Sequence, residues 1–428
     1  MSNTAQTVIQ KKFAGDDRIK TILTVAVVIS LPLLMAFPTV AGWLAATMAV
    51  AGLTVLAKQR EMNRMDWCFA AICLVLPFSY VLNMLMKGWA TSYLDRPSHL
   101  LFSLMIFYLI GCFGIHRNSL FYGACAGALT TFFIAIYSAF YLGEERVSGL
   151  GGRWNAVPFG NFSLLLAFYC LCGTFSSEQT KQKKTIKLLL GIAGFASGLF
   201  ASFLSGSRGG WLALPVLIIL CLWYNTKLNK RTRTIAVVML ITIIAAISMN
   251  SNRVRQRLDT GIKDVSNYLS NPDDLASRST SSGIRLAMWK WGTKKFIEHP
   301  FIGIGYAAYT KERDKAVKTG ELPDEFGHLA NVHNEMINSL ALGGIISGAA
   351  LIVFWITSWR FFLVRLKKAQ HDDEYFYALC GLLTIAGIGI FSMTEGLFGT
   401  SPGTKALLLT LAIPAGALRY SYLKKQSV

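Results

Sequence analysis

Apolar residues occupy most of this chain in long runs, and short polar segments separate one run from the next. A transmembrane helix needs about twenty predominantly apolar residues to cross roughly 30 Å of hydrocarbon. Windows of that length predict twelve membrane-spanning helices, at 21–37, 39–57, 66–86, 98–115, 118–142, 156–175, 185–204, 209–225, 234–250, 335–359, 375–395 and 403–422. Only Pro38 and its neighbours separate the first two windows, so these could instead form one broken helical hairpin.

One polar segment is much longer than the other connections and divides the predicted helices into two groups. We therefore expect transmembrane helices 1–9 in residues 1–250, a loop with amphipathic helices at 251–334, and transmembrane helices 10–12 in residues 335–428. Within the loop, apolar and basic residues share a helical pattern from about Ile284 to His299, and Pro300 ends it.

Lysines and arginines gather in every second connection between the predicted helices. The segments on the side of the N-terminus hold Lys11, Lys12, Arg18, Lys20, Lys58, Arg60, Arg64, Arg117, Lys181, Lys183, Lys184, Lys187, Lys227, Lys230, Arg231, Arg233, Arg360, Arg365, Lys367, Lys368, Arg419, Lys424 and Lys425. The short loops of the opposite side hold only Lys87, Arg96, Arg146, Arg153, Arg208 and Lys405. Because basic residues concentrate in cytoplasmic loops, this asymmetry predicts that both termini are cytoplasmic and that the 251–334 loop lies outside.

The composition agrees with these predicted helices and excludes other classes of protein. Of the 428 residues, 53% are hydrophobic and 15% are charged, which is too apolar for a soluble domain. We therefore predict an all-α polytopic membrane protein. The formal net charge of +19 follows from loop topology and from attraction to lipid headgroups, so no nucleic-acid partner is expected.

The cysteines and the N-terminus add little chemistry. All eight cysteines fall inside apolar stretches, so they are interpreted as small buried hydrophobic residues rather than a disulfide framework. The N-terminus has no small-residue cleavage site after a short apolar core, so the first apolar stretch is expected to be a retained span.

The stretch FLSGSRGGWLAL at 203–214 places one charge, Arg208, between two predicted helices. Its glycines allow close approach of a ligand, and the helix that follows would present its N-terminal amides outward. An arginine beside a helix N-terminus is typical of a phosphate site. A plain turn with a snorkelling arginine remains the other interpretation.

Two further outward residues stand at helix beginnings. Arg285 lies in the first turn of the amphipathic helix, where the helix dipole disfavours a cation, although a helix lying on anionic headgroups would also carry such charges. His333 opens the tenth span in the stretch NVHNEMINSLALGGIISG, where a neutral imidazole could accept a proton or simply cap the helix. Two arginines for an anion and one histidine for a hydroxyl together predict group transfer from a phosphorylated donor.

Two more outward residues are weaker candidates. Arg153, in LGGRWNAVPFGN, could assist in binding phosphate or lie in a surface turn. Glu395, in MTEGLFGTSPG, could orient His333 or a sugar.

The sequence shows no sign of a nucleotide or a metal. It contains no P-loop and no GxGxxG, and Asp273 and Asp274 follow Asn-Pro in an expected turn. We therefore expect no cofactor, no metal, and metal-independent transfer.

Three motifs in this order resemble the O-antigen ligase and polymerase family: the SRGGWLAL turn, the Arg-x-x-x-Trp helix followed by HPFIGIGYAAY, and HNE before a glycine-rich membrane helix. The resemblance covers mainly residues 200–350, and the size of the single large loop is most similar to the lipopolysaccharide O-antigen ligases. It implies a GT-C-like glycosyltransferase of the inner membrane of Gram-negative bacteria with a periplasmic active site.

The resemblance also implies the substrates and the roles of the residues. The donor would be an O-antigen glycan on undecaprenyl diphosphate, and the acceptor a sugar hydroxyl of lipid A-core. His333 would act as base, and Arg208 and Arg285, with Arg153 as a weaker candidate, would bind the diphosphate in an inverting single displacement.

Three other functions remain open on the sequence alone. An O-antigen polymerase shares the motifs but more often shows two substantial outer loops, and a protein O-oligosaccharyltransferase of the same family is usually longer. A secondary transporter would place ionisable groups near mid-membrane and would show repeated halves.

Overall fold

The computed structural model describes residues 17–59, 62–175, 180–223, 252–272, 274–396 and 401–426, together with the isolated residues 231, 234 and 238. These residues form helices joined by short connections. The α-helices are α2 (Asp17–Ala36), α3 (Pro38–Lys58), α4 (Arg64–Lys87), α5 (Thr91–Phe113), α6 (Ser119–Ile136), α7 (Ala156–Gly173), α8 (Lys181–Ser205), α9 (Arg208–Trp223), α11 (Asn252–Ser270), α12 (Leu275–Arg278), α13 (Gly283–Glu298), α14 (Tyr309–Lys318), α15 (Glu335–Lys368), α16 (Asp372–Phe391) and α17 (Ser401–Gln426). A π-helical turn, Tyr137–Tyr141, continues α6.

Ten of the described helices are long and apolar enough to cross a membrane. They are α2, α3, α4, α5, α6 with its π-helical turn, α7, α8, α15, α16 and α17. At the eighth predicted window, α9 is shorter, with 16 residues. The ninth window, 234–250, lies outside the described residues except for two isolated positions. The prediction of an all-α polytopic membrane protein is confirmed, and the count of twelve spans stays a prediction.

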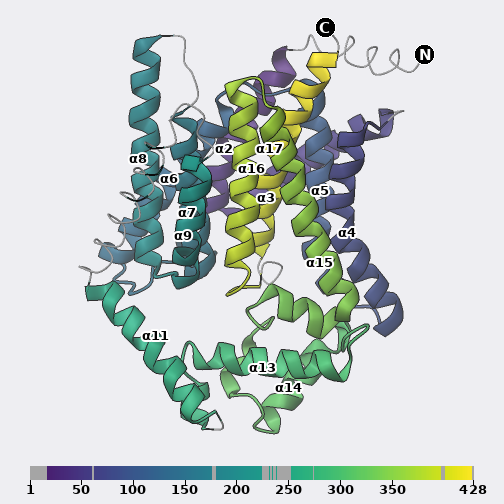
Figure 1. The fold of residues 1–428 in the computed structure, drawn as a ribbon, viewed down its shortest axis with the longest axis vertical. Coiled ribbons are helices and arrows are strands. Elements are labelled where there is room, and N and C mark those ends of the chain that lie inside the picture. Colours follow the sequence, from purple (N-terminus) through teal and green to yellow (C-terminus); the bar gives the residue numbers. More distant parts are fainter. Residues whose placement is uncertain are drawn as a thin grey trace.

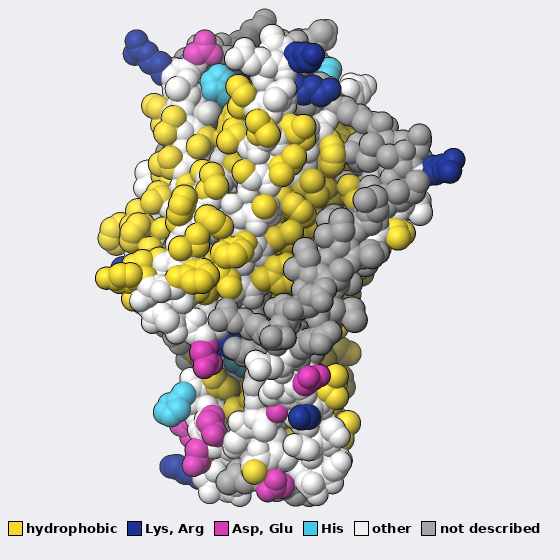
Figure 2. Space-filling view, turned by 90° about the vertical axis from the view of Figure 1, so that its left-hand side faces the viewer, with side chains coloured by type: hydrophobic (Ala, Val, Ile, Leu, Met, Phe, Trp, Pro, Cys, Tyr) yellow, Lys and Arg dark blue, Asp and Glu magenta, His cyan; other side chains and the backbone are white. Residues whose placement is uncertain are grey.

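The long helices stand side by side as a bundle, and α11, α13 and α14 lie beyond one end of it (Figure 1). Figure 2 shows yellow hydrophobic side chains gathered in a broad band over the bundle, with charged side chains above and below the band. Large side chains of this kind are exposed on several helices, among them Trp43 at 70%, Phe78 at 68% and Phe133 at 65%. An apolar belt between two polar ends is the surface that a bilayer requires.

The first two predicted windows form two separate helices. Only Phe37 lies between α2 and α3, and Pro38 begins α3, where its missing N–H and fixed φ are tolerated. The two helices also pack against different neighbours, α2 against α6 and α3 against α5. The alternative of a single broken hairpin is therefore not what the structure shows.

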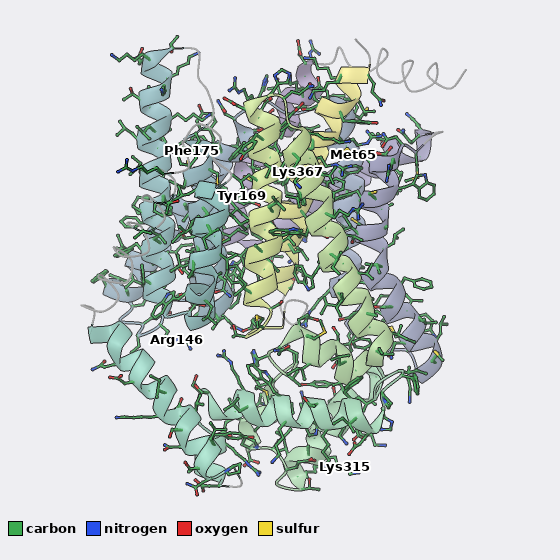
Figure 3. All side chains as sticks on the ribbon, viewed as in Figure 1. Met65, Arg146, Tyr169, Phe175, Lys315 and Lys367 are labelled. Carbon is green, nitrogen blue, oxygen red and sulfur yellow. The ribbon has the colours of Figure 1, made fainter. Side chains whose placement is uncertain are left out.

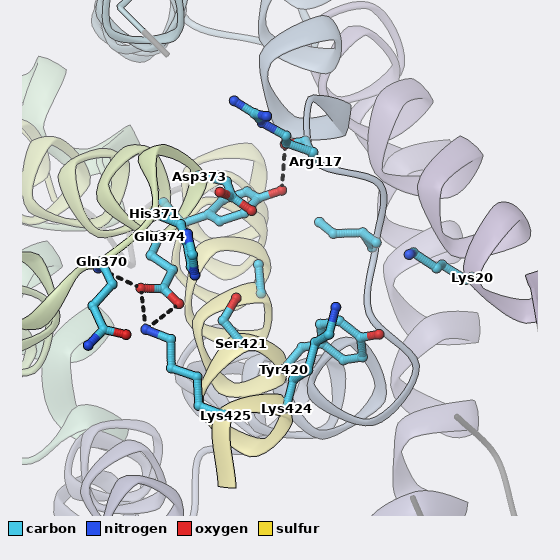
Figure 4. A pocket seen from close by; sticks show the side chains of 13 residues that line it. Lys20, Arg117, Gln370, His371, Asp373, Glu374, Tyr420, Ser421, Lys424 and Lys425 are labelled. Carbon is cyan, nitrogen blue, oxygen red and sulfur yellow. Dashed lines mark hydrogen bonds and ion pairs between the residues drawn. The ribbon is translucent and has the colours of Figure 1, made fainter. Parts of the chain in front are cut away.

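The two ends of the described chain meet at the end of the bundle away from α13 and α14 (Figure 1). A cavity of about 730 Å³ there is lined by Lys20 near the start of α2, Arg117, Glu374 and Lys425 near the end of α17 (Figure 4). Residues that the lysine and arginine pattern assigns to one side of the membrane therefore lie together in space.

The amphipathic helix that the sequence predicts from Ile284 to His299 is present as α13, Gly283–Glu298. It packs against α15, and the chain that follows it is bonded to a break in α15. The break falls at Gly344, whose φ of 64° and ψ of −160° are not helical. A Cβ atom at Gly344 would lie 2.3 Å from the carbonyl carbon of Phe301, so only glycine allows this approach.

The break leaves backbone carbonyls of α15 free to bond the HPFIGIGY segment. The amide of Ile304 donates to the carbonyl of Ala341 and the amide of Gly305 to that of Leu342, both at 2.9 Å. On the other side, Asn83 of α4 donates from its side chain to the carbonyl of Ile302 at 2.7 Å. The glycines of this motif and of the membrane helix that follows thus fix α13 against the beginning of α15.

Candidate active site

His333 lies immediately before α15 in a strained backbone conformation. Its φ of 51° makes it the non-glycine residue with positive φ in the described part of the chain. The side chain of Asn331 accepts a hydrogen bond from the His333 amide at 2.8 Å, and Asn331 itself is buried. Strained residues persist only where their surroundings hold them, and they are concentrated at functional sites. This conformation makes His333 a candidate on structural grounds, independently of its chemistry.

The His333 side chain faces a carboxylate from the far end of the sequence. Its Nδ1 atom lies 3.0 Å from Oε1 of Glu395, and the two side chains are 19% and 10% exposed. Neither atom forms a hydrogen bond with another described residue. A carboxylate at one ring nitrogen fixes the orientation of an imidazole and leaves the other nitrogen to accept a proton. The structure therefore brings together two of the predicted site residues.

Three contacts hold the turn between α16 and α17 against the beginning of α15. The amide of Glu335 donates to the carbonyl of Ser392 at 2.9 Å, and the Asn334 side chain donates to the carbonyl of Met393 at 3.0 Å. A Cβ atom at Gly396 would lie 2.5 Å from the side chain of Asn331. Two hydrogen bonds to the residues before Glu395 and a close approach at the residue after it thus set the position of Glu395 relative to His333.

The SGSRGG turn also lies beside the turn that carries Glu395. It joins α8 to α9, and a Cβ atom at Gly209 would lie 2.2 Å from the hydroxyl of Thr394, the residue before Glu395. Glycine at 209 is therefore needed for this close approach. The Ser207 hydroxyl donates to the side chain of Asn161 on α7 at 2.7 Å. Arg208 is the first residue of α9, so its backbone lies beside the Thr394–Glu395 turn, while its side chain lies outside the described residues.

Arg285 approaches from α13. The indole of Trp289 on this helix donates to the carbonyl of Val332 at 3.1 Å, directly before His333. Arg285 is half-buried and lies four residues before Trp289, which places it on the same face of the helix one turn away. The helix thus carries Arg285 toward the side on which His333 lies.

Arg153 lies elsewhere. Its guanidinium is 5.3 Å from the ring centroid of Phe37, between α2 and α3, and the neighbouring Trp154 is buried with its indole bonded to the carbonyl of Leu34. The contacts described for Arg153 therefore place it at the α2–α3 junction rather than beside His333. Its role in binding phosphate stays a prediction.

Arg146 is a basic residue near this site that the sequence does not single out. Its Nε atom donates to the carbonyl of Ser205 at 3.4 Å, at the end of α8 just before the SGSRGG turn. In Figure 3 it lies at the end of the bundle that faces α11 and α13. The only signal in the sequence is that Arg146 belongs to the few cations of the outer connections.

Three further features lie in the outer part of the described chain: two buried tyrosines, a small cavity, and the placement of the possible metal ligands. Burial raises the pKa of Tyr306 and Tyr309 further above the ordinary tyrosine range, which lies well above neutral pH already. A cavity of about 20 Å³, room for roughly one water, lies between α7 and the turn that carries Glu395. In the part of the chain that the structure describes, no three His, Cys, Asp or Glu side chains are placed to hold a metal ion.

These observations define a polytopic α-helical membrane protein with a polar site where three connections meet at one end of its bundle. The family model described as O-antigen ligase matches residues 193–353, which include Arg208, Arg285 and His333. This region is therefore similar to the O-antigen ligase family, and the resemblance expected from the motifs is confirmed.

Two curated relatives share part of the chain. An uncharacterized protein of Haemophilus influenzae is 27% identical over 299 residues, which span 69% of this chain and 73% of the relative. An O-antigen ligase of Escherichia coli is 26% identical over 203 residues, which span 45% of this chain and 43% of that ligase. The match to the ligase thus covers less than half of either protein.

Proposed function

We propose that this protein is a glycosyltransferase of the bacterial inner membrane that completes lipopolysaccharide. It would move an O-antigen glycan from undecaprenyl diphosphate to a sugar hydroxyl of lipid A-core at the periplasmic face. The observation that carries the proposal is the pairing of His333 with Glu395 where the SGSRGG turn meets the α16–α17 turn. The match of residues 193–353 to the O-antigen ligase family supports the same conclusion.

The proposed step is a single displacement with inversion. The acceptor hydroxyl oxygen forms a bond to the anomeric carbon of the glycan, while the bond from that carbon to the diphosphate oxygen breaks. His333 takes the hydroxyl proton on Nε2, and Glu395, 3.0 Å from Nδ1, stabilises the resulting imidazolium. The diphosphate leaves with the bonding electron pair.

The second requirement is to stabilise the negative charge that develops on the diphosphate leaving group. Arg208 and Arg285 would bind the diphosphate, because a planar guanidinium can grip two phosphate oxygens at once. The first backbone amides of α9 lie at the positive end of the helix dipole. They would further stabilise the negative charge of the diphosphate. With these groups the reaction needs no metal, and Arg153 would contribute only if the donor extends to the α2–α3 junction.

The orientation of the site follows from the lysine and arginine pattern. We place the end of the bundle that holds Lys20, Arg117 and Lys425 in the cytoplasm and the His333 end in the periplasm. The division of the chain into 1–250, 251–334 and 335–428 is part of the same proposal.

Reconstitution of the purified protein in nanodiscs tests the function directly. With undecaprenyl-diphosphate-linked glycan and rough lipopolysaccharide, we expect glycan to appear on the lipopolysaccharide, and transfer should persist in excess EDTA. Glycan chain growth on a second lipid-linked donor would instead identify a polymerase, and transfer to a peptide a protein glycosyltransferase. Activity lost in EDTA and restored by magnesium would contradict the metal-independent step.

A further inference from the structure

A second cavity lies at the end of the bundle away from the His333 site. It has a volume of about 480 Å³ and is formed by α4, α15 and α17. Met65, which lines it, and Lys367 of α15 both lie toward this end in Figure 3, whereas Lys315 of α14 lies at the other end. The lining residues are Arg64, Met65, Cys68, Ala71, Thr357, Arg360, Phe361, Val364, Arg365, Lys368 and Tyr422.

The charges around this cavity all have one sign. Four cations line it, Arg64 from α4 and Arg360, Arg365 and Lys368 from α15, and no carboxylate is among the described lining residues. None of the four belongs to an ion pair with a described acidic residue. Arg365 is held in place by its own helix, since it donates to the carbonyl of Phe361 at 3.1 Å and lies 3.9 Å from the centroid of that ring.

The wall that α4 contributes to the cavity becomes apolar with depth. On α4, Arg64 is followed along the same face by Cys68 and Ala71. Ala71 lies two helical turns from Arg64, about 10 Å nearer the middle of the membrane. On α4 the cation thus lies at the rim and small apolar side chains lie below it, which is the polarity of a phospholipid with its headgroup outward.

The cavity of Figure 4, at the same end of the bundle, provides a contrast. It also holds several cations, among them Lys20, Arg117 and Lys424, but Asp373 and Glu374 line it as well. Lys425 is bonded to Glu374 at 2.8 Å there. A basic rim alone is expected wherever helices end in the cytoplasm, whereas the cavity beside α4 combines uncompensated cations with an apolar wall.

We propose that the cavity between α4, α15 and α17 binds an anionic diacylphospholipid of the surrounding bilayer. Its phosphate lies among Arg64, Arg360, Arg365 and Lys368, and an acyl chain follows the wall formed by Cys68 and Ala71. This site lies at the opposite end of the bundle from His333, and it does not depend on the function proposed above.

Native mass spectrometry of the full chain in detergent tests the proposal. We expect at least one phosphatidylglycerol molecule to stay bound under conditions that remove phosphatidylethanolamine. The double variant R64Q/R360Q should lower phosphatidylglycerol affinity on the order of tenfold. Both side chains are exposed, so their replacement should leave the thermal unfolding temperature unchanged. The matched variant K20Q/K424Q, with the same loss of charge at the other cavity, should leave lipid binding unchanged.

Cys68 offers a second readout that needs no variant. It is exposed and lines the cavity, whereas the other seven cysteines are buried. A maleimide should label Cys68 at least severalfold more slowly in nanodiscs with phosphatidylglycerol than in nanodiscs of phosphatidylcholine alone. Equal labelling rates together with equal lipid affinities of R64Q/R360Q and wild type would overturn the proposal. Protection by inorganic phosphate in the absence of anionic lipid would overturn the assignment to a lipid.

Discussion

Two pairs of ionisable side chains, one at each end of the bundle, are built in different ways. Asp66 on α4 and Arg419 on α17 are buried, with side-chain exposures of 0% and 2%, and they are joined by two hydrogen bonds of 2.7 and 3.2 Å. His333 and Glu395 are more exposed, at 19% and 10%, and lie 3.0 Å apart without a hydrogen bond.

The surroundings of the two pairs differ as well, because the Asp66–Arg419 pair has further contacts whereas His333 has a bonding atom without a partner among the described residues. Asp66 also accepts a hydrogen bond from the amide of Asn63 and so completes a capping box at the start of α4. The Arg419 guanidinium lies 4.7 Å from the ring of Tyr108. His333, by contrast, is held in a left-handed backbone conformation, and its side chain keeps unused bonding capacity. A buried pair whose members are hydrogen-bonded to each other stabilises the fold, whereas a strained residue with an unused bonding atom is available to a substrate.

The largest effect is expected on stability from the buried pair. Asp66→Ala leaves Arg419 buried without its partner, so we expect the free energy of unfolding to fall by about 3–5 kcal/mol. Thermal unfolding in detergent measures this. Lys425→Gln is the matched control, because Lys425 pairs with Glu374 at the same end but is 36% exposed, and its loss should cost less than about 1 kcal/mol. Equal losses of stability in the two variants would contradict the structural role assigned to the buried Asp66–Arg419 pair.

Glu395→Gln should instead lower turnover and leave stability unchanged. The amide keeps the size of the side chain but cannot stabilise an imidazolium, so turnover should fall about 10- to 100-fold while the unfolding temperature is retained. The transfer rate at saturating donor is the measurement. A large loss of stability with unchanged turnover of the folded fraction would assign Glu395 to the fold instead.

Arg285→Lys and Arg208→Lys should weaken donor binding as well as turnover. Each variant keeps the charge but loses the planar fork, so we expect about a tenfold loss of affinity for the lipid diphosphate. Binding of undecaprenyl diphosphate to the nanodisc-embedded variants measures this loss. Lysine variants with normal affinity would show that only charge matters at these positions.

Trp289→Phe should have the smallest effect. It keeps an aromatic ring on α13 but removes the hydrogen bond to the carbonyl of Val332, worth about 1 kcal/mol, so turnover should fall only a few-fold. A loss as large as that of Glu395→Gln would mean that α13 positions His333 far more than one bond implies.

The fold class and several site positions could be predicted from the sequence because they depend on local patterns. Apolar windows predict the ten spanning helices that the structure describes, and the amphipathic pattern places α13 to within one residue at each end. The family resemblance likewise rests on short motifs in the matched region.

What could not be predicted depends on contacts between distant residues. Asp66 and Arg419 are 353 positions apart, and no local pattern shows that they meet. The approach of Gly209 to Thr394 and the left-handed conformation of His333 also follow from packing between elements. The sequence leaves open whether Glu395 orients His333 or a sugar, and only the three-dimensional arrangement of the two turns favours the first.

The central claim is that His333 acts as the base and does not hold the donor or the fold. The most direct test is His333→Ala in the reconstituted system, with the transfer rate, the donor affinity and the unfolding temperature measured on one preparation. We predict a rate at least about 100-fold below wild type, with donor affinity and unfolding temperature unchanged. Transfer by His333→Ala at the wild-type rate would contradict the claim and leave Glu395 as the next candidate for the base.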